Sequence, residues 1–280
     1  MNKNLIEKYI VPLSPIPTDV RPAGKLSHPI DGILFDIYGT LFISDSGDIG
    51  VAKAKDQKQY QLKELLEKYD LKLTPEKLLQ ALYARIEKVH GKLRKDGIDF
   101  PEVEIDEIWM YILQTDDRHI IQQFAIEFEL IFNPVYPMPN LKEILLILKH
   151  RRLLMGIISN AQFFTPYLFE WFLGSDLKQL GVHPNLVILS YQLKYAKPSA
   201  MLFDLAVQRL SQLGVQAESV LYIGNDMLND IYPARKAGFT TVLFAGDKRS
   251  LRLRQDDHRC ANISADLVIT DLSQLLDHLK

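Results

Sequence analysis

Short apolar segments alternate with amphipathic helical segments in the second half of this chain, from residue 141 to the C-terminus. The predicted helices span 141–150, 164–173, 199–212 and 230–237 with a further terminal helix, and the predicted strands span 153–158, 186–189, 220–223, 241–244 and 267–269. Strands that alternate with helices form a parallel sheet, because each helical crossover returns the chain to the same end of the sheet. The pattern therefore predicts an α/β fold with a doubly wound parallel sheet.

The stretch 33–42 predicts one further strand of this sheet. It begins with the apolar run Ile-Leu-Phe, continues with Asp36 and turns at Gly39-Thr40. A buried parallel strand of this kind would place Asp36 at its carboxyl end, the edge at which open α/β sheets bind ligands. The simpler alternative is an ordinary core strand that ends in a turn, since Asp and Gly are common turn residues.

Residues 50–134 interrupt the alternation with helical patterns alone. Leucines from 62 to 66 repeat at the spacing of one buried helical face, and Thr74-Pro75 is a typical helix start. Two more helices are predicted at 106–114 and 118–132, and three prolines between 134 and 139 end the helical region. We therefore expect an all-helical insertion at 50–134 and an α/β core at 30–49 and 135–280.

Residues 1–29 form a separate N-terminal arm that is rich in proline. They contain five of the fourteen prolines, which prevent a continuous helix and favour extended backbone. We expect this arm to be disordered. The alternative is that it wraps around the body or a neighbouring subunit through Ile10, Val11 and Leu13.

The composition is that of an ordinary soluble protein. Apolar residues make up 47% and charged residues 24% of the 280 residues, and the net charge of −2 gives no reason to expect nucleic acid or a membrane surface as partner. The single cysteine, Cys260, leaves no intramolecular disulfide. No signal peptide and no membrane-spanning segment is recognised. We expect a cytoplasmic protein, and the sequence leaves the oligomeric state open.

Polar residues follow four of the predicted strands. Asp36 follows the first, Ser159-Asn160 and Asn225-Asp226 follow two others, and Lys197 lies in the loop after a fourth. The carboxyl ends of parallel strands share one edge, so these side chains can converge although they are far apart in the sequence. Carboxylates, a hydroxyl and an ammonium group together suit an anion with a divalent cation.

With these motifs in this order, the chain resembles the haloacid dehalogenase superfamily over residues 31–272. The resemblance rests on Asp36-Ile-Tyr-Gly-Thr-Leu, Ser159-Asn160, Lys197-Pro198 and Gly224-Asn-Asp-Met-Leu-Asn-Asp230. It implies a Rossmann-like core, and the insertion after the first motif resembles the all-helical cap of one subgroup. In these hydrolases the first aspartate is a nucleophile, so Asp36 would form a covalent aspartyl intermediate, which is an aspartyl phosphate in the phosphatases.

The resemblance also implies a metal site and groups that stabilise charge. Mg²⁺ would be held by Asp36, the backbone carbonyl of Tyr38 and Asp226, and Asp230 would bind it through water or fix Lys197. Charge on the transferred group would be stabilised by Thr40, Ser159 and Lys197. Asn160 would orient the same loop.

The register of the last motif is open, because the family places either three or four residues between its two acids. Asn225 replaces the first acid in one register, and Asp226 is that acid in the other. The non-catalytic alternative for Asp226 and Asp230 is a helix cap and a solvated helix start.

Tyr38 departs from the phosphatase pattern, in which this position is usually a second aspartate that acts as acid and base. A tyrosine here resembles the 2-haloacid dehalogenases, which work without metal. Three positions resemble the phosphatases instead: no arginine lies between Arg21 and Arg85, Phe203 stands where dehalogenases carry tyrosine, and Asp226 stands where they carry serine.

Substrate specificity would come from Tyr38 and from the helical insertion. Glu102, in a loop expected to face the active site, is one candidate, and Arg94 belongs to a basic run that either attracts an anionic substrate or forms a solvated helix face. The favoured function is a Mg²⁺-dependent phosphatase of a small phosphorylated metabolite. The alternatives are a 2-haloacid dehalogenase and a non-catalytic scaffold that binds a phosphorylated ligand or a partner.

Overall fold

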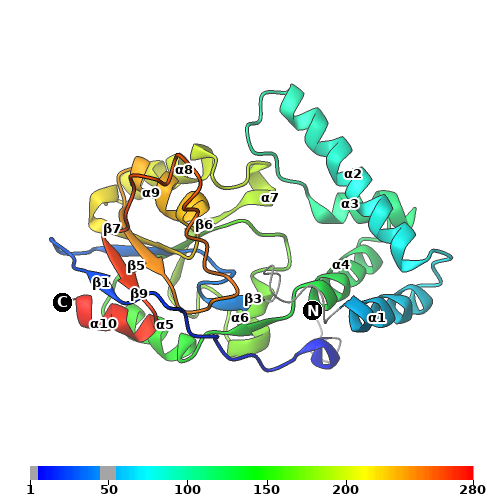
Figure 1. The fold of residues 1–280 in the computed structure, drawn as a ribbon, viewed down its shortest axis with the longest axis horizontal. Helices are drawn as coiled ribbons and strands as arrows, with labels where there is room; N and C mark the ends of the chain where they lie inside the picture. The colour runs from blue at the N-terminus through cyan, green and yellow to red at the C-terminus, as the bar shows by residue number, and fades with distance from the viewer. Residues whose placement is uncertain (1–5, 45–54, 280) are drawn as a thin grey trace.

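A computed structural model describes residues 6–44 and 55–279 of the chain. An α/β core lies beside a group of helices built by residues 55–132, which we call the helical lobe (Figure 1). The predicted boundary between core and insertion, at residue 50, falls outside the described residues. No helix in the described part is long and apolar enough to cross a membrane.

The core contains a seven-stranded sheet in the order β1-β9-β8-β7-β2-β5-β6. Its strands are β1 (Ala23–Gly24), β2 (Gly32–Phe35), β5 (Leu154–Ser159), β6 (Val182–Leu189), β7 (Val220–Gly224), β8 (Thr240–Phe244) and β9 (Leu267–Ile269). All neighbouring strands are parallel except β1, which pairs antiparallel with β9. The predicted parallel sheet is confirmed, and β2 lies between β5 and β7.

Helices cover both faces of this sheet. The core helices are α5 (Leu141–His150), α6 (Tyr167–Leu173), α7 (Ser190–Leu193), α8 (Ala200–Gln212), α9 (Tyr232–Lys236) and α10 (Leu275–His278). Successive residues of β2 point to opposite faces, so Ile33 and Phe35 pack in the cluster that contains α5, whereas Leu34 packs against α8. The sheet is therefore doubly wound, as the strand and helix alternation predicts.

The helical lobe consists of α1 (Lys55–Lys68), α2 (Pro75–Lys95), α3 (Ile105–Leu113) and α4 (Arg118–Phe132). Thr74 caps α2 by accepting a hydrogen bond from the Lys77 amide at 3.3 Å. Trp109 is fully buried and packs edge-on against Phe124, which joins α3 to α4. The chain enters the lobe after β3 (Phe42–Ser44) and leaves it through β4 (Val135–Pro137), and these two strands pair antiparallel.

The N-terminal arm contacts both parts of the molecule, so the expectation of disorder is wrong for residues 6–29. The Tyr9 hydroxyl donates a 2.7 Å hydrogen bond to Glu127 in α4 of the helical lobe. Farther along, the Ile16 amide donates to Asp247 at 3.1 Å, and the Ile16 carbonyl accepts from the Lys248 amide at 2.8 Å, both in the core. Ile10 and Leu13 pack against the apolar core, whereas Val11 is exposed.

Candidate active site

The central strands bring Asp36, Ser159 and Lys197 together. The Asp36 amide continues the sheet by donating to the Ile223 carbonyl at 2.9 Å, which places its side chain at the carboxyl end of β2. Oδ1 of Asp36 accepts hydrogen bonds from the Ser159 hydroxyl at 2.9 Å and from the Lys197 ammonium at 2.7 Å. All three side chains are buried. The other oxygen, Oδ2, has no hydrogen-bond partner among the described residues.

The turn after Asp36 brings the backbone close to a neighbouring loop. Gly39 has φ +82°, and a Cβ added there would lie 2.5 Å from Cβ of Ser250 and 2.7 Å from Nδ2 of Asn225. Only glycine suits both the backbone conformation and the space. The next residue, Thr40, is buried and donates from its hydroxyl to Oδ1 of Asn225 at 3.1 Å.

Lys197 is held between two carboxylates. Its ammonium lies 2.5 Å from Oδ1 of Asp230 and 3.2 Å from the Tyr222 hydroxyl, in addition to its contact with Asp36. Burial by itself lowers the pKa of Lys197, but the charges of Asp230 and Asp36 outweigh this effect and leave the pKa above its ordinary value. Lys197 is therefore a permanent positive charge beside Asp36.

Asp230 uses both oxygens to position its surroundings. Oδ1 accepts from Lys197 and from the Tyr222 hydroxyl at 2.9 Å, and Oδ2 accepts from the amides of Asn225 and Asp226 at 3.0 Å each. Burial raises the pKa of Asp230 to about 6, although the charge of Lys197 opposes the shift. Of the two roles expected for Asp230, this geometry supports the one of fixing Lys197.

Asn160 fixes the loop that carries Lys197. Its Oδ1 accepts from the Lys197 amide at 2.7 Å, and its Nδ2 donates to the Lys197 carbonyl at 3.4 Å. The orienting role predicted for Asn160 agrees with this geometry.

Tyr38 points its hydroxyl at Thr165, with 3.0 Å between the two oxygens. Burial, with a smaller effect of the Glu129 charge, raises the pKa of Tyr38 well above its ordinary value. Its hydroxyl therefore stays protonated and is no substitute for the acid/base aspartate at neutral pH.

The Asp226 carboxylate binds the short helix that follows it and Arg254, and its expected role as a direct metal ligand stays a prediction. Its carboxylate caps the short helix Met227–Ile231 by accepting from the Leu228 amide at 2.8 Å. The same carboxylate is bound by the Arg254 guanidinium, with Nη2 2.6 Å from Oδ2. Asn225 instead faces the Thr40 hydroxyl, and its Nδ2 donates to the Ser250 carbonyl at 2.6 Å. In this structure Asn225 stands where the first acid of the motif was expected.

The groups left for a divalent cation are few but suitable. No group of three or more His, Cys, Asp or Glu side chains within 6–44 and 55–279 is arranged to hold a metal ion. Asp36 offers one open carboxylate oxygen, and the Asn225 amide oxygen, which accepts from Thr40 in the turn after Asp36, is a second hard ligand. Mg²⁺ is commonly bound by one or two carboxylates, several waters and substrate phosphate. The residues present therefore fit Mg²⁺, with the smallest number of protein ligands at which the ion is commonly bound.

The family model for haloacid dehalogenase-like hydrolases matches residues 30–238, which include all four motifs. The chain belongs to the haloacid dehalogenase-like hydrolases. This hydrolase is 25% identical over 254 residues to a glyceraldehyde 3-phosphate phosphatase of Methanocaldococcus jannaschii, with 90% of this chain and 97% of the relative covered. It is 30% identical over 105 residues to a ribulose-1,5-bisphosphate 5-phosphatase of Halopiger xanaduensis, and this match covers 37% of this chain and 43% of the relative.

Solved structures of the same fold include both kinds of enzyme in the family. A 2-haloacid dehalogenase from Pseudomonas syringae superposes with a TM-score of 0.54 at 20% identity, covering 89% of this hydrolase and 97% of that chain. A phosphatase from Thermococcus onnurineus superposes with a TM-score of 0.53 at 18% identity, with the same coverage. These likenesses show the fold, whereas the phosphatase-named sequence relatives favour a phosphatase over a dehalogenase.

A pocket of about 290 Å³ lies where the helical lobe of this hydrolase meets the core. Its lining comes from the core (Tyr38, Asn160, Ala161, Gln162 and Phe164), from the helical lobe (Glu102 and Glu129) and from Asn133, which directly follows the lobe. Tyr38 lies two residues after Asp36, and Asn160 follows Ser159, which binds Asp36, so the pocket lies beside Asp36. None of the described residues that line it is Lys, Arg or His.

Glu102, a predicted specificity residue, lines this pocket but serves to join the lobe to the core. Its Oε2 accepts from the Ser190 hydroxyl at 2.8 Å, and its backbone amide donates to the Lys194 carbonyl at 3.0 Å. Arg94 does not line the pocket; it is exposed and pairs with Glu87 at 2.7 Å. Glu129 and Arg254 were not predicted, because only the tertiary structure brings them to this region.

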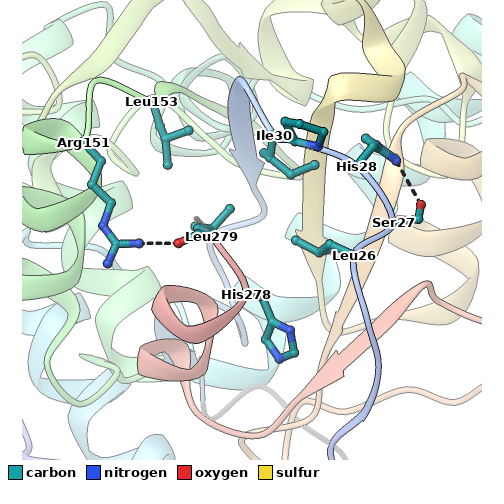
Figure 2. A pocket seen from close by; sticks show the side chains of 9 residues that line it. Leu26, Ser27, His28, Ile30, Arg151, Leu153, His278 and Leu279 are labelled. Carbon is teal, nitrogen blue, oxygen red and sulfur yellow. Dashed lines mark hydrogen bonds between the residues drawn. The ribbon is translucent and has the colours of Figure 1, made fainter.

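A larger pocket of about 550 Å³ lies at the opposite edge of the sheet (Figure 2). It is lined by Ile30 and Leu153, which precede β2 and β5, and by His28, Arg151 and His278. Arg151 donates to the Leu279 carbonyl at 2.7 Å and so holds the C-terminal helix. This pocket is remote from Asp36.

Proposed function

We propose that this hydrolase is a phosphatase of a small phosphorylated metabolite that works in the cytoplasm through an aspartyl phosphate on Asp36. The observation that carries the proposal is the Asp36 carboxylate, in which Oδ1 is held by Ser159 and Lys197 and Oδ2 is open. The phosphatase-named relatives support phosphoryl transfer as the reaction.

In the first step, Oδ2 of Asp36 attacks phosphorus and the bond from phosphorus to the ester oxygen breaks. The ester oxygen leaves as an alkoxide that takes a proton from water, and the phosphoryl group stays on Asp36. Ser159 and Lys197, which hold Oδ1 of Asp36, would stabilise charge on the transferred group together with Thr40, whose hydroxyl binds Asn225. Water then attacks phosphorus, which releases inorganic phosphate and restores the Asp36 carboxylate.

Mg²⁺ would be held by Asp36, the Tyr38 backbone carbonyl and the Asn225 amide oxygen. When bound, it would neutralise negative charge on the phosphoryl oxygens. Asp230 and Asn160 would not touch it; they hold Lys197 in place.

Tyr38 leaves the reaction without the usual acid/base aspartate. Such a loss typically lowers the rate by about 10²–10⁴-fold, so this phosphatase is expected to be slow unless the leaving group or water supplies the proton transfer.

A 2-haloacid dehalogenase is the second candidate, and Tyr38 together with the neutral Asn225 favours it. A 2-haloacid carries a carboxylate, which such an enzyme must bind with a positive charge. The described residues of the pocket beside Asp36 include none. The phosphatase is therefore the better supported function.

A parallel screen tests the proposal. Wild type and Asp36→Asn are incubated with a panel of phosphate esters and with 2-chloropropionate, each with and without Mg²⁺. Phosphate release by wild type alone, stimulated by Mg²⁺, is the expected result. Chloride release without phosphate release would establish the dehalogenase instead. If neither phosphate nor chloride were released and Asp36 formed no beryllofluoride adduct, the protein would be a non-catalytic scaffold that binds a ligand or a partner.

A further inference from the structure

We propose that Glu129 makes this site selective for phosphate esters with a neutral, hydroxylated leaving group and excludes esters that carry a carboxylate. The inference rests on the proposed phosphatase function and concerns the part of the substrate that occupies the pocket beside Asp36.

Glu129 lines this pocket and carries an open carboxylate oxygen. Its Oε1 accepts a 3.1 Å hydrogen bond from Nδ2 of Asn133, and its Oε2 has no partner among the described residues. The contrast with Glu127, two residues earlier in α4, is clear. Glu127 is fully buried and is bound by Lys68, Tyr9 and Tyr69, so its charge is compensated.

Three other polar side chains that line the pocket, those of Glu102, Gln162 and Asn160, already form hydrogen bonds with protein groups. Glu102 accepts from Ser190 with one oxygen and from the Val103 amide with the other. Gln162 donates to the Val103 carbonyl and accepts from the Ile105 amide, and Asn160 binds the backbone of Lys197 at both ends. The Glu129 carboxylate is therefore the open acceptor that a substrate hydroxyl can reach.

Electrostatics gives this acceptor its selectivity. The pocket already contains the carboxylates of Glu102 and Glu129 and no lysine, arginine or histidine in its described lining, so a substrate carboxylate would add like charge with no compensating cation. A hydroxyl, in contrast, donates to a carboxylate in a strong hydrogen bond. Burial raises the pKa of Glu129, which agrees with a carboxyl group in a poorly solvated place.

The test compares two esters that differ at one carbon, glycerol 3-phosphate and 3-phosphoglycerate. We expect wild type to prefer glycerol 3-phosphate by at least about tenfold in kcat/KM. Glu129→Gln should reduce this preference by about tenfold, mainly by lowering KM for 3-phosphoglycerate. Glu87→Gln removes the same charge from an exposed position of the helical lobe and should leave the preference unchanged.

Hydrolysis of p-nitrophenyl phosphate by each variant separates the two proposals, and thermal melting shows that each variant is folded. An active wild type without preference, or the same preference in wild type and Glu129→Gln, overturns the role of Glu129 but leaves the phosphatase intact. No hydrolysis of any of the three esters overturns the phosphatase and the selectivity with it.

Discussion

The Arg254 guanidinium binds the Asp226 carboxylate through two nitrogens, with Nη2 2.6 Å from Oδ2 and Nε 3.1 Å from Oδ1. This pairing raises the pKa of Arg254, mainly through the hydrogen bond to Asp226. It also decides which member of the Asn225-Asp226 pair lies against the turn after Asp36. Asp226 is turned to Arg254 and to the helix that it caps, so Asn225 is the residue beside Thr40 and Gly39.

Asn225→Asp should strengthen Mg²⁺ binding, because it adds a second carboxylate near Asp36. Without metal the two carboxylates repel, so the variant should melt at a lower temperature than wild type and recover when Mg²⁺ is added. We expect the Mg²⁺ concentration for half-maximal stabilisation to fall on the order of tenfold. Thermal melting over a Mg²⁺ series measures this without reference to activity.

Asp226→Asn is the matched control for that prediction. It weakens the cap and the Arg254 pair, so it should lower stability by about 1–3 kcal/mol and leave the Mg²⁺ concentration dependence unchanged. If Asp226→Asn abolished the response to Mg²⁺ while Asn225→Asp did not alter it, the assignment of the register would be wrong.

Tyr38→Phe should leave phosphatase activity within about threefold of wild type, far from the 10²–10⁴-fold loss that follows removal of a general acid or base. The reason is that the raised pKa of Tyr38 keeps its hydroxyl protonated and Thr165 holds it. Tyr38→Asp should increase kcat, because it places a carboxyl group where phosphatases of the family carry one. Steady-state kinetics on p-nitrophenyl phosphate measures both variants. A loss of about 10²-fold or more in Tyr38→Phe would show that the Tyr38 hydroxyl does take part in acid/base catalysis.

Glu129 should make stability depend on pH. Burial raises its pKa above the ordinary value of 4.5, against the opposing hydrogen bond from Asn133. The folded state then holds the proton more tightly than the unfolded chain, so this stabilisation is complete below about pH 4.5 and is lost as pH rises through the raised pKa. The melting temperature of Glu129→Gln relative to wild type should therefore increase from about pH 4 to about pH 8. A difference that stays constant or shrinks over this range argues against the shift.

Glu127→Ala should destabilise the protein strongly, by about 3–5 kcal/mol. The change leaves Lys68 without its partner at 2.5 Å and removes the acceptor that ties the Tyr9 hydroxyl of the N-terminal arm to the helical lobe. Urea denaturation measures the effect. Lys63→Ala, which removes only an exposed ion pair with Glu67 at 3.9 Å, serves as control and should cost about 0.5 kcal/mol or less. Equal losses in the two variants would show that the buried network contributes little.

Local sequence pattern predicted the regular elements well where they are periodic. The helix expected at 141–150 is α5, Leu141–His150, because its apolar residues repeat on one face. The pattern missed β3 and β4, since strands of three residues, one of them with Pro137, carry almost no periodic signal. For the N-terminal arm it favoured disorder over the alternative of packing on the body, because prolines indicate an extended backbone and not the surface on which that backbone lies.

The sequence by itself determined the parallel sheet and the edge at which Asp36, Ser159 and Lys197 meet. The reason is that polar residues at the carboxyl ends of parallel strands all lie at the same edge of the sheet. Only the tertiary structure decided the direction of Asp226, the exposure of Arg94 and the place of Glu129 in the lining of the pocket. These depend on partners far away in the chain, such as Arg254, and on packing between the helical lobe and the core. The position of a strand along the chain follows from the local apolar pattern, whereas the direction of a side chain follows from the charges and space around it.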